Sequence, residues 1–291
     1  MPHIPPPDRD GFTGTTPVPL YWCAYGAGEP ALVLHGGPGA SHDYLLPQML
    51  QLAPGRALHF YDQRGGGRSR HDDDREPITW QSQVDDVGRV MREMALDRPL
   101  LVGYSWGGLL ALLHAVSASE RGETAILPKR LVLIDPAPVT RAWREEFETE
   151  FARRQQGPTV QALRSELSAS GLRERDPAAY RQRAFEVSVA GYFADPRRAR
   201  DLTPFRVTGR VQQSIWASLG DFDLRPALAA LRARAAIPTL VVHGRQDPIP
   251  LASSEACARA LDGELVVLDD CGHVPYVEQP AGLFAAVERF R

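Results

Sequence analysis

The sequence predicts an α/β protein whose mostly parallel sheet is covered by helices on both faces and interrupted by a helical cap. Short, continuously apolar runs of the kind found in doubly buried strands alternate with helical stretches over residues 31–136 and again over 238–290. Residues 137–235 between them contain helical, strongly charged stretches and no strand-like apolar run. We therefore predict a core domain of residues 1–136 and 236–291 and a cap domain of residues 137–235.

The N-terminal half of the chain contains most of the expected strands. A proline-rich arm is followed by an antiparallel strand over residues 18–25. A helix is expected over about 42–52, and another begins at Thr79, where valine and methionine recur at helical spacing. The tract around Asp72, Asp73 and Asp74 lacks the glycine and the downstream glutamate of a calcium loop and predicts a solvated loop. Buried strands are expected over residues 31–34, 57–61, 99–102 and 130–135.

The alternation of strands and helices resumes after the predicted cap. Strands are expected over residues 238–244 and 264–268, and helices over about 253–261 and 279–290. The loops that follow these strands lie at the same edge of a parallel sheet as the loops that follow the earlier ones. That edge is where the chemistry of such a fold is located.

Residues 99–113 contain the strongest functional signal. An apolar run ends in Gly103-Tyr104-Ser105-Trp106-Gly107 and passes directly into a second apolar run that is expected to be helical. A strand that ends in Gly-x-Ser-x-Gly and opens into a helix is typical of a nucleophile elbow, in which a tight turn exposes the serine. Glycine at the two flanking positions avoids clashes between Cβ atoms and the neighbouring strand and helix. Ser105 is therefore the predicted nucleophile.

A nucleophilic serine needs a base to remove its proton and an acid to orient that base. In the chain order serine, acid, histidine, the candidates are Asp247 and His273, each in a glycine-containing loop after a late strand. Asp135 is a rival acid, because it also follows a strand at the expected edge. His35 and Asp62 follow strands there as well. We interpret the remaining strand and helix histidines, His59, His114 and His243, as structural.

The oxyanion of a tetrahedral intermediate needs backbone donors. The N–H of Trp106, directly after the nucleophile, is one candidate, and the N–H of Gly37 in the run Gly36-Gly37-Pro38-Gly39 is the other. Because this run lacks side chains over three of its positions, the backbone can approach a substrate there, and Gly36 is a predicted substrate contact.

Composition excludes several other functions. A net charge of −3 and an isoelectric point near 6.3 leave no basic surplus for nucleic acid. Cys23, Cys257 and Cys271 are an odd number without C-x-x-C spacing, so neither a disulfide framework nor a zinc site is indicated. Residues 1–8 do not resemble a signal peptide, and no apolar run is long enough to span a membrane. We expect a soluble, cytoplasmic protein without cofactor or metal; its oligomeric state is not predicted.

Three motifs together resemble the proline iminopeptidase family of α/β-hydrolases. They are His35-Gly36-Gly37-Pro38-Gly39, Asp62-Gln63-Arg64-Gly65-Gly66-Gly67-Arg68-Ser69 and Gly103-Tyr104-Ser105-Trp106-Gly107-Gly108. The spacing of Asp247 and His273 agrees, and the resemblance covers roughly residues 16–136 and 236–290. It implies an α/β-hydrolase fold with a cap-covered pocket. In such a pocket acidic side chains hold the free amino terminus of a substrate while the serine cleaves after an N-terminal proline or apolar residue.

The sequence departs from that pattern at the acids. Pro248 stands where some members carry an acid directly after the catalytic aspartate, and the neutral Gln212 or Gln213 falls near the second expected acid. A buried ammonium needs a compensating charge, so other cap acids would have to replace them. The candidates are Glu186, Asp221 and Asp223. The candidate aromatic pocket residues are Trp143, Tyr192 and Trp216, together with Phe185, Phe193, Phe205 and Phe222.

The sequence thus predicts a serine hydrolase that forms an acyl-enzyme with a small-molecule or short peptide substrate. Release of an N-terminal residue, which the resemblance favours, is the first prediction. Hydrolysis of a small, uncharged apolar ester or lactone is favoured by the missing acids. A lyase or a non-hydrolytic ligand receptor that retains the serine, histidine and aspartate is the remaining alternative.

Overall fold

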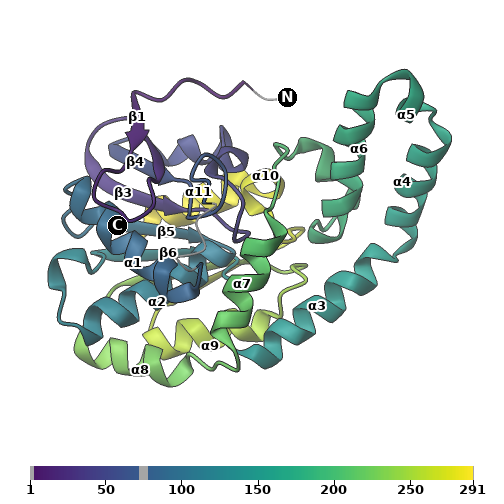
Figure 1. Cartoon of the computed structure of the whole chain (residues 1–291). Coiled ribbons are helices and arrows are strands. Elements are labelled where there is room, and N and C mark those ends of the chain that lie inside the picture. Colours follow the sequence, from purple (N-terminus) through teal and green to yellow (C-terminus); the bar gives the residue numbers. More distant parts are fainter. Residues whose placement is uncertain (1–2, 72–77, 291) are drawn as a thin grey trace.

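The computed structural model describes residues 3–71 and 78–290 and consists of one sheet, its covering helices and a helical extension (Figure 1). The sheet order is β1-β2-β4-β3-β5-β6-β7-β8. Strands β3 to β8 run parallel to one another, whereas β1 is antiparallel to β2 and β2 is antiparallel to β4. The strands are β1 (Arg9–Phe12), β2 (Tyr21–Tyr25), β3 (Glu29–Leu34), β4 (Arg56–Tyr61), β5 (Leu100–Tyr104), β6 (Arg130–Ile134), β7 (Thr239–Gly244) and β8 (Glu264–Leu268). The predicted α/β-hydrolase architecture is confirmed.

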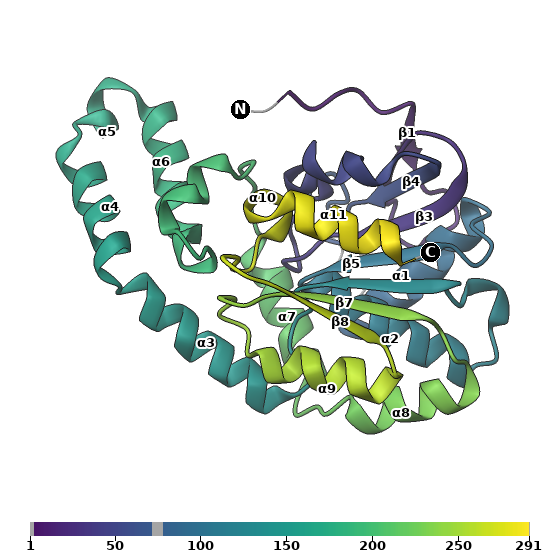
Figure 2. The same cartoon turned by 180° about the vertical axis from the view of Figure 1, so that it is seen from behind.

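The central strands are mainly apolar because both faces of the sheet are covered. On β5, Leu101 packs into the core cluster of one face, and Leu100 and Val102 pack into that of the other. The first cluster contains residues of the helices that lie below the sheet in Figure 2, such as α8 and α9. The second contains residues of α11, which lies above the sheet in that view. The helices of the core are α1 (Trp80–Glu93), α2 (Trp106–Glu120), α8 (Arg225–Arg234), α9 (Leu251–Leu261), α10 (Pro275–Glu278) and α11 (Pro280–Arg289), with the 3₁₀ turns η1 (His42–Leu45), η2 (Gln48–Leu52) and η3 (Thr124–Ile126).

Between β6 and β7 the chain leaves the sheet and forms the helical extension, of which α3 to α6 reach furthest from the core (Figures 1 and 2). Its two ends are hydrogen-bonded to each other: Arg141 N–H donates to Phe222 O and Leu224 N–H to Val139 O, both at 2.9 Å. The next helix, α8, packs against α2 and α9 of the core. We therefore propose that the cap domain is narrower than residues 137–235 and ends near Asp223. The helices of the extension are α3 (Arg141–Gln155), α4 (Pro158–Ala169), α5 (Leu172–Arg175), α6 (Pro177–Val189) and α7 (Gly209–Leu219), with the 3₁₀ turns η4 (Ala190–Tyr192) and η5 (Pro196–Asp201).

Two local predictions were wrong. The single helix expected over 42–52 is the pair of short turns η1 and η2, interrupted at Pro47, whose ring and missing N–H do not fit a helix interior. The strand over residues 18–25 was expected directly after the proline-rich arm, but β1 lies between them and pairs with β2, although its Asp and Gly are unfavourable in strands. The tract around Asp72 lies outside the described residues. Within the described chain, no helix has both the length and the apolar character to cross a bilayer.

Candidate active site

Ser105 lies at the turn between β5 and α2. Its backbone has φ 54° and ψ −122°, a conformation that non-glycine residues rarely adopt and that marks a strained position. The turn is closely packed: a Cβ at Gly103 would lie 2.4 Å from Gly107 O, and a Cβ at Gly107 would lie 2.1 Å from Leu34 O. Glycine is therefore required at both positions of the elbow, and the serine side chain remains partly exposed.

His273 connects Ser105 to Asp247. The Ser105 Oγ and His273 Nε2 atoms are 2.9 Å apart, and His273 Nδ1 is 2.7 Å from Asp247 Oδ2. The second oxygen of Asp247, Oδ1, accepts the Ile249 N–H at 2.7 Å. These residues lie after β5, β7 and β8, so the parallel sheet brings together side chains that are far apart in sequence. The geometry suits proton transfer from the serine to the histidine, with the aspartate orienting the imidazole.

The loop that carries His273 is held by both the core and the cap. The His273 N–H donates to Tyr192 O at 2.7 Å, and Tyr104 Oη donates to His273 O at 2.9 Å. The Tyr192 ring stacks on the imidazole with centroids 5.2 Å apart. Glu278 accepts the N–H groups of Gly272 and Ala194, each at 2.8 Å. His273 is therefore positioned directly by Tyr192 of the helical extension.

Burial determines the charge of this pair. Loss of hydration lowers the pKa of His273 and raises the pKa of Asp247, because neither charged form is solvated. The two groups share a hydrogen bond, so they titrate together rather than independently. With a lowered pKa the imidazole is uncharged at neutral pH and can accept the serine proton.

The two predicted oxyanion donors lie on the same cavity as Ser105, since Gly37 and Trp106 both line it. Trp106 is the first residue of α2, whose initial N–H groups have no partner within the helix. Its indole Nε1–H donates to Gln63 Oε1 at 2.9 Å, and Gln63 Nε2 donates to His35 O at 2.7 Å. This chain of bonds fixes the glycine loop after β3 relative to the elbow.

A hydrogen-bonded pair, Asp62 and His42, also holds the glycine loop after β3. Asp62 Oδ1 accepts from His42 N at 2.9 Å and from His42 Nδ1 at 2.7 Å, and Oδ2 accepts from Arg68 N at 2.8 Å. Although burial disfavours the imidazolium, the Asp62 carboxylate raises the pKa of His42 to about 10. Asp62 was predicted at the reactive edge from its place after a strand. Its partners assign it to the support of the glycine loop.

A cavity of about 330 Å³ opens in front of Ser105. Of the four predicted substrate contacts, Tyr192 and Trp216 line this cavity, whereas Gly36 and Trp143 are not among its lining residues. A Cβ at Gly36 would lie 2.7 Å from the Ser105 Cβ, so Gly36 is behind the serine; Trp143 packs against the core. We therefore leave these two out of the proposed substrate contacts. The cavity is lined by Gly37, Pro38, Ser105, Trp106, Ala137, Pro138, Arg144, Phe147, Glu148, Phe151, Tyr192, Gln212, Gln213, Trp216, Ile249 and His273.

The contribution of α3 to this wall was not predicted from the sequence. Arg144, Phe147, Glu148 and Phe151 recur at helical spacing and form one face of the helix. The charged composition of residues 143–148 indicated a solvent-exposed helix, because charged helices usually face water. The spacing of the two phenylalanines was the available signal.

The charges of the cavity wall compensate each other. Glu148 is the one acid among the described lining residues, and its Oε1 accepts from Arg144 Nε at 2.9 Å and also from Arg144 Nη2. The Arg144 guanidinium lies 3.6 Å from the centre of the Trp216 ring. The cap acids considered from the sequence, Glu186, Asp221 and Asp223, do not line the cavity. The wall that faces a substrate is therefore mostly apolar and contains one ion pair, Arg144 with Glu148, whose charges compensate each other.

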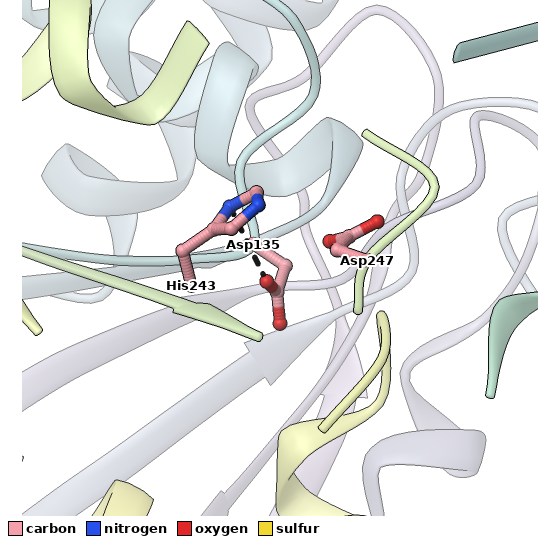
Figure 3. A group of neighbouring side chains, drawn as sticks. All are labelled: Asp135, His243 and Asp247. Atoms are coloured by element: carbon pink, nitrogen blue, oxygen red, sulfur yellow. Dashed lines mark ion pairs between the residues drawn. The ribbon is translucent and has the colours of Figure 1, made fainter. Parts of the chain in front are cut away.

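Asp135, His243 and Asp247 form a buried group with ligand-type atoms within 4.8 Å of one another (Figure 3). Most of these atoms already have partners. His243 Nδ1 is 2.9 Å from Ser254 Oγ, both Asp247 oxygens accept hydrogen bonds, and Asp135 Oδ1 accepts the Gly244 N–H at 2.8 Å. A metal ion would have to displace these bonds, so we assign none to the group.

The chain is similar to known proteins over most of its length. Residues 31–287 match the alpha/beta hydrolase family. A curated relative, the proline iminopeptidase of Lactobacillus delbrueckii subsp. lactis, is 26% identical over 267 residues, which cover 87% of this chain and 86% of that protein. The crystal structure of proline iminopeptidase from Mycobacterium smegmatis superposes with a TM-score of 0.68 at 21% identity and covers 97% of each chain. An E-2-(acetamidomethylene)succinate hydrolase superposes with a TM-score of 0.65 at 21% identity, over 97% of this chain and 98% of that one.

Proposed function

The chain belongs to the alpha/beta hydrolase family, and we propose that it is a serine hydrolase that forms an acyl-enzyme with a small amide or ester. The observation that carries this proposal is the unbroken hydrogen-bond chain from Ser105 through His273 to Asp247 at the wall of a cavity. A structural serine would not need a neutral, buried imidazole within 2.9 Å of its hydroxyl.

In the proposed reaction, His273 Nε2 removes the Ser105 proton while Oγ attacks the substrate carbonyl. The N–H groups of Trp106 and Gly37 stabilise the oxyanion of the tetrahedral intermediate. His273 then gives its proton to the leaving amine or alcohol, and an ester between Ser105 and the acyl group remains. A water molecule, deprotonated by His273, releases the acid and restores the serine, while Asp247 stabilises the imidazolium in both halves of the reaction.

Two substrate classes follow from different observations. Curated relatives named proline iminopeptidase favour release of an N-terminal residue, and Glu148 is the cavity acid that would bind the amino group. The charge balance of the cavity favours an uncharged substrate, because Arg144 already compensates Glu148. A buried ammonium needs an acid of its own. We therefore propose an uncharged apolar ester or amide as the substrate and retain aminopeptidase activity as the second candidate.

A substrate panel separates the two classes. We expect N-acetyl and free-amine arylamides of proline and alanine to be hydrolysed at rates within about threefold of each other. The reason is that no unpaired acid among the described lining residues would stabilise the ammonium group of the free-amine substrate. Acetyl and butyryl aryl esters should be hydrolysed faster than either arylamide. The measurement is kcat/KM for each substrate with purified protein.

The aminopeptidase candidate predicts the opposite pattern. A preference of about tenfold or more for the free amine, lost in Glu148→Gln, would assign amino-terminus binding to Glu148, since a tenfold change equals about 1.4 kcal/mol of binding. Glu145→Gln is the matched control, because Glu145 is on the same helix, pairs with Arg141 and does not line the cavity.

A further inference from the structure

Asp135 is a fully buried acid whose hydrogen bonds are incomplete. It is the residue directly after β6, has φ 41°, and its N–H donates to Val242 O at 2.8 Å. Its Oδ1 accepts the Gly244 N–H at 2.8 Å, but its buried Oδ2 has no partner. A buried carboxylate oxygen without a donor is costly, so this oxygen calls for an explanation.

The explanation lies in the neighbouring carboxyl group. Ligand-type atoms of Asp135 and Asp247 lie within 4.8 Å of each other, as Figure 3 shows for the two side chains. Two buried carboxylates at this separation do not both ionise, and one of them retains a proton. A protonated carboxyl group has an O–H donor, and the adjacent carboxylate is its natural acceptor.

The hydrogen bonds indicate which group keeps the proton. Asp247 receives two N–H donors, one from Ile249 and one from His273, and the Arg154 guanidinium bonds to its main-chain oxygen at 3.4 Å. Asp135 receives only the Gly244 N–H. His243 gives no compensating charge, because burial lowers its pKa to about 4. The ionised group is therefore Asp247.

We infer that Asp135 is a positioning residue whose carboxyl group stays protonated and donates a hydrogen bond from Oδ2 to the carboxylate of Asp247. This third donor keeps Asp247 ionised and directed at His273. The inference rests on the proposed function, because it concerns the acid that orients the catalytic base.

The electrostatics of the surroundings agree. Burial, together with the charge of Asp247, raises the pKa of Asp135 far above its ordinary value. Burial also raises the pKa of Asp247, and the hydrogen bond from Asp135 acts in the opposite direction. The other titratable or charged groups that face the pair are His243 on β7, Tyr104 on β5, Tyr192 on η4, Cys271 and His273 after β8, Tyr276 and Glu278 on α10, and Arg154 on α3.

Two substitutions at Asp135 test the role through the pH dependence of kcat/KM. Asp135→Asn keeps the shape of the side chain and an N–H donor toward Asp247, so we expect activity within about threefold of wild type. The acidic limb of the pH profile, along which kcat/KM falls as the pH is lowered, should be unchanged. Asp135→Leu removes the donor. We expect kcat to fall about tenfold and the acidic limb to move up by about one pH unit, since the Asp247–His273 pair then binds its proton more tightly.

Other outcomes overturn the inference. If Asp135 were ionised, both variants would remove a negative charge near the imidazolium and move the acidic limb to lower pH. If Asp135 were only structural, both would lose activity in step with their melting temperatures, without any shift of the limb.

An infrared measurement tests the proton directly and does not depend on activity. With ¹³C-labelled aspartate, wild-type protein at pH 7 should show the carbonyl stretch of a protonated aspartic acid, and Asp135→Asn should lack it. Glu278→Gln is the control, because Glu278 is the nearby buried glutamate whose pKa burial also raises. Survival of the labelled band in Asp135→Asn would overturn the inference. If Ser105 proved inert, the proposed function would fail while the band remained, so the two failures are distinguishable.

Discussion

Replacing Ser105 by alanine is expected to lower kcat by about 10⁴-fold or more, because no other group can form the acyl-enzyme. The Trp106 and Gly37 donors and the cavity remain, so KM should change little. Alanine has the same Cβ as serine, so it should fit the elbow as well and leave the melting temperature near that of wild type. The measurement is the initial rate on the best ester of the substrate panel.

The control is Ser188→Ala, at an exposed serine on α6 that does not line the cavity. It should keep the wild-type rate. A Ser105→Ala protein with more than about 1% of the wild-type kcat would contradict a nucleophilic role, because only about two orders of magnitude would then depend on the hydroxyl.

Replacing His273 by alanine should cost a similar factor of about 10⁴ or more in kcat, because the serine and the base act as one unit. The double variant Ser105→Ala/His273→Ala should be no slower than either single variant. The reason is that without the imidazole the hydroxyl is a poor nucleophile, and without the hydroxyl the imidazole has no proton to move.

His59→Gln is the matched control for this prediction. His59 is a buried histidine on β4 whose Nδ1 bonds to Ala57 O at 3.0 Å, and it does not line the cavity. Activity near wild type in this variant would separate the loss of the base from the general cost of removing a buried imidazole. Equal losses in the two histidine variants would instead attribute the effect of His273→Ala to folding.

The fold could be predicted because strands covered on both faces leave a simple pattern. Strands such as β5 and β6 are almost continuously apolar, with Arg130 at the start of β6 as the exception, and a loop residue at the sheet edge follows each of them. The meeting of Ser105, Asp247 and His273 could be predicted from the same rule, because parallel strands deliver their C-terminal loops to one edge. Their order along the chain did not distinguish Asp247 from Asp135, because both acids lie between Ser105 and His273; the hydrogen bond of His273 to Asp247 does.

What the sequence did not predict depends on contacts between distant segments. The cavity wall formed by α3 includes an ion pair, Arg144 with Glu148, that sequence patterns assign to solvent. The hydrogen bond from His273 N–H to Tyr192 O joins a cap turn to a core loop, and no local signal marks either partner. Strand β1 depends on pairing with β2, which compensates for its weak strand propensity.

Asp135, the rival candidate for the acid, belongs to the same group of buried side chains as Asp247. It was a rival for the acid because it follows a strand at the reactive edge. The structure has the imidazole bonded to Asp247 and Asp135 buried beside that acid. Two carboxyl groups at one site are consistent with different protonation states, one charged and one neutral.

The most direct test of the central claim is reaction of the folded protein with a fluorophosphonate, followed by mass spectrometry of its peptides. The expected result is one phosphonyl group on Ser105, absent from heat-unfolded protein and formed far more slowly in His273→Ala. An unmodified Ser105 in folded protein whose melting curve shows a cooperative transition would contradict the proposal that His273 activates this serine.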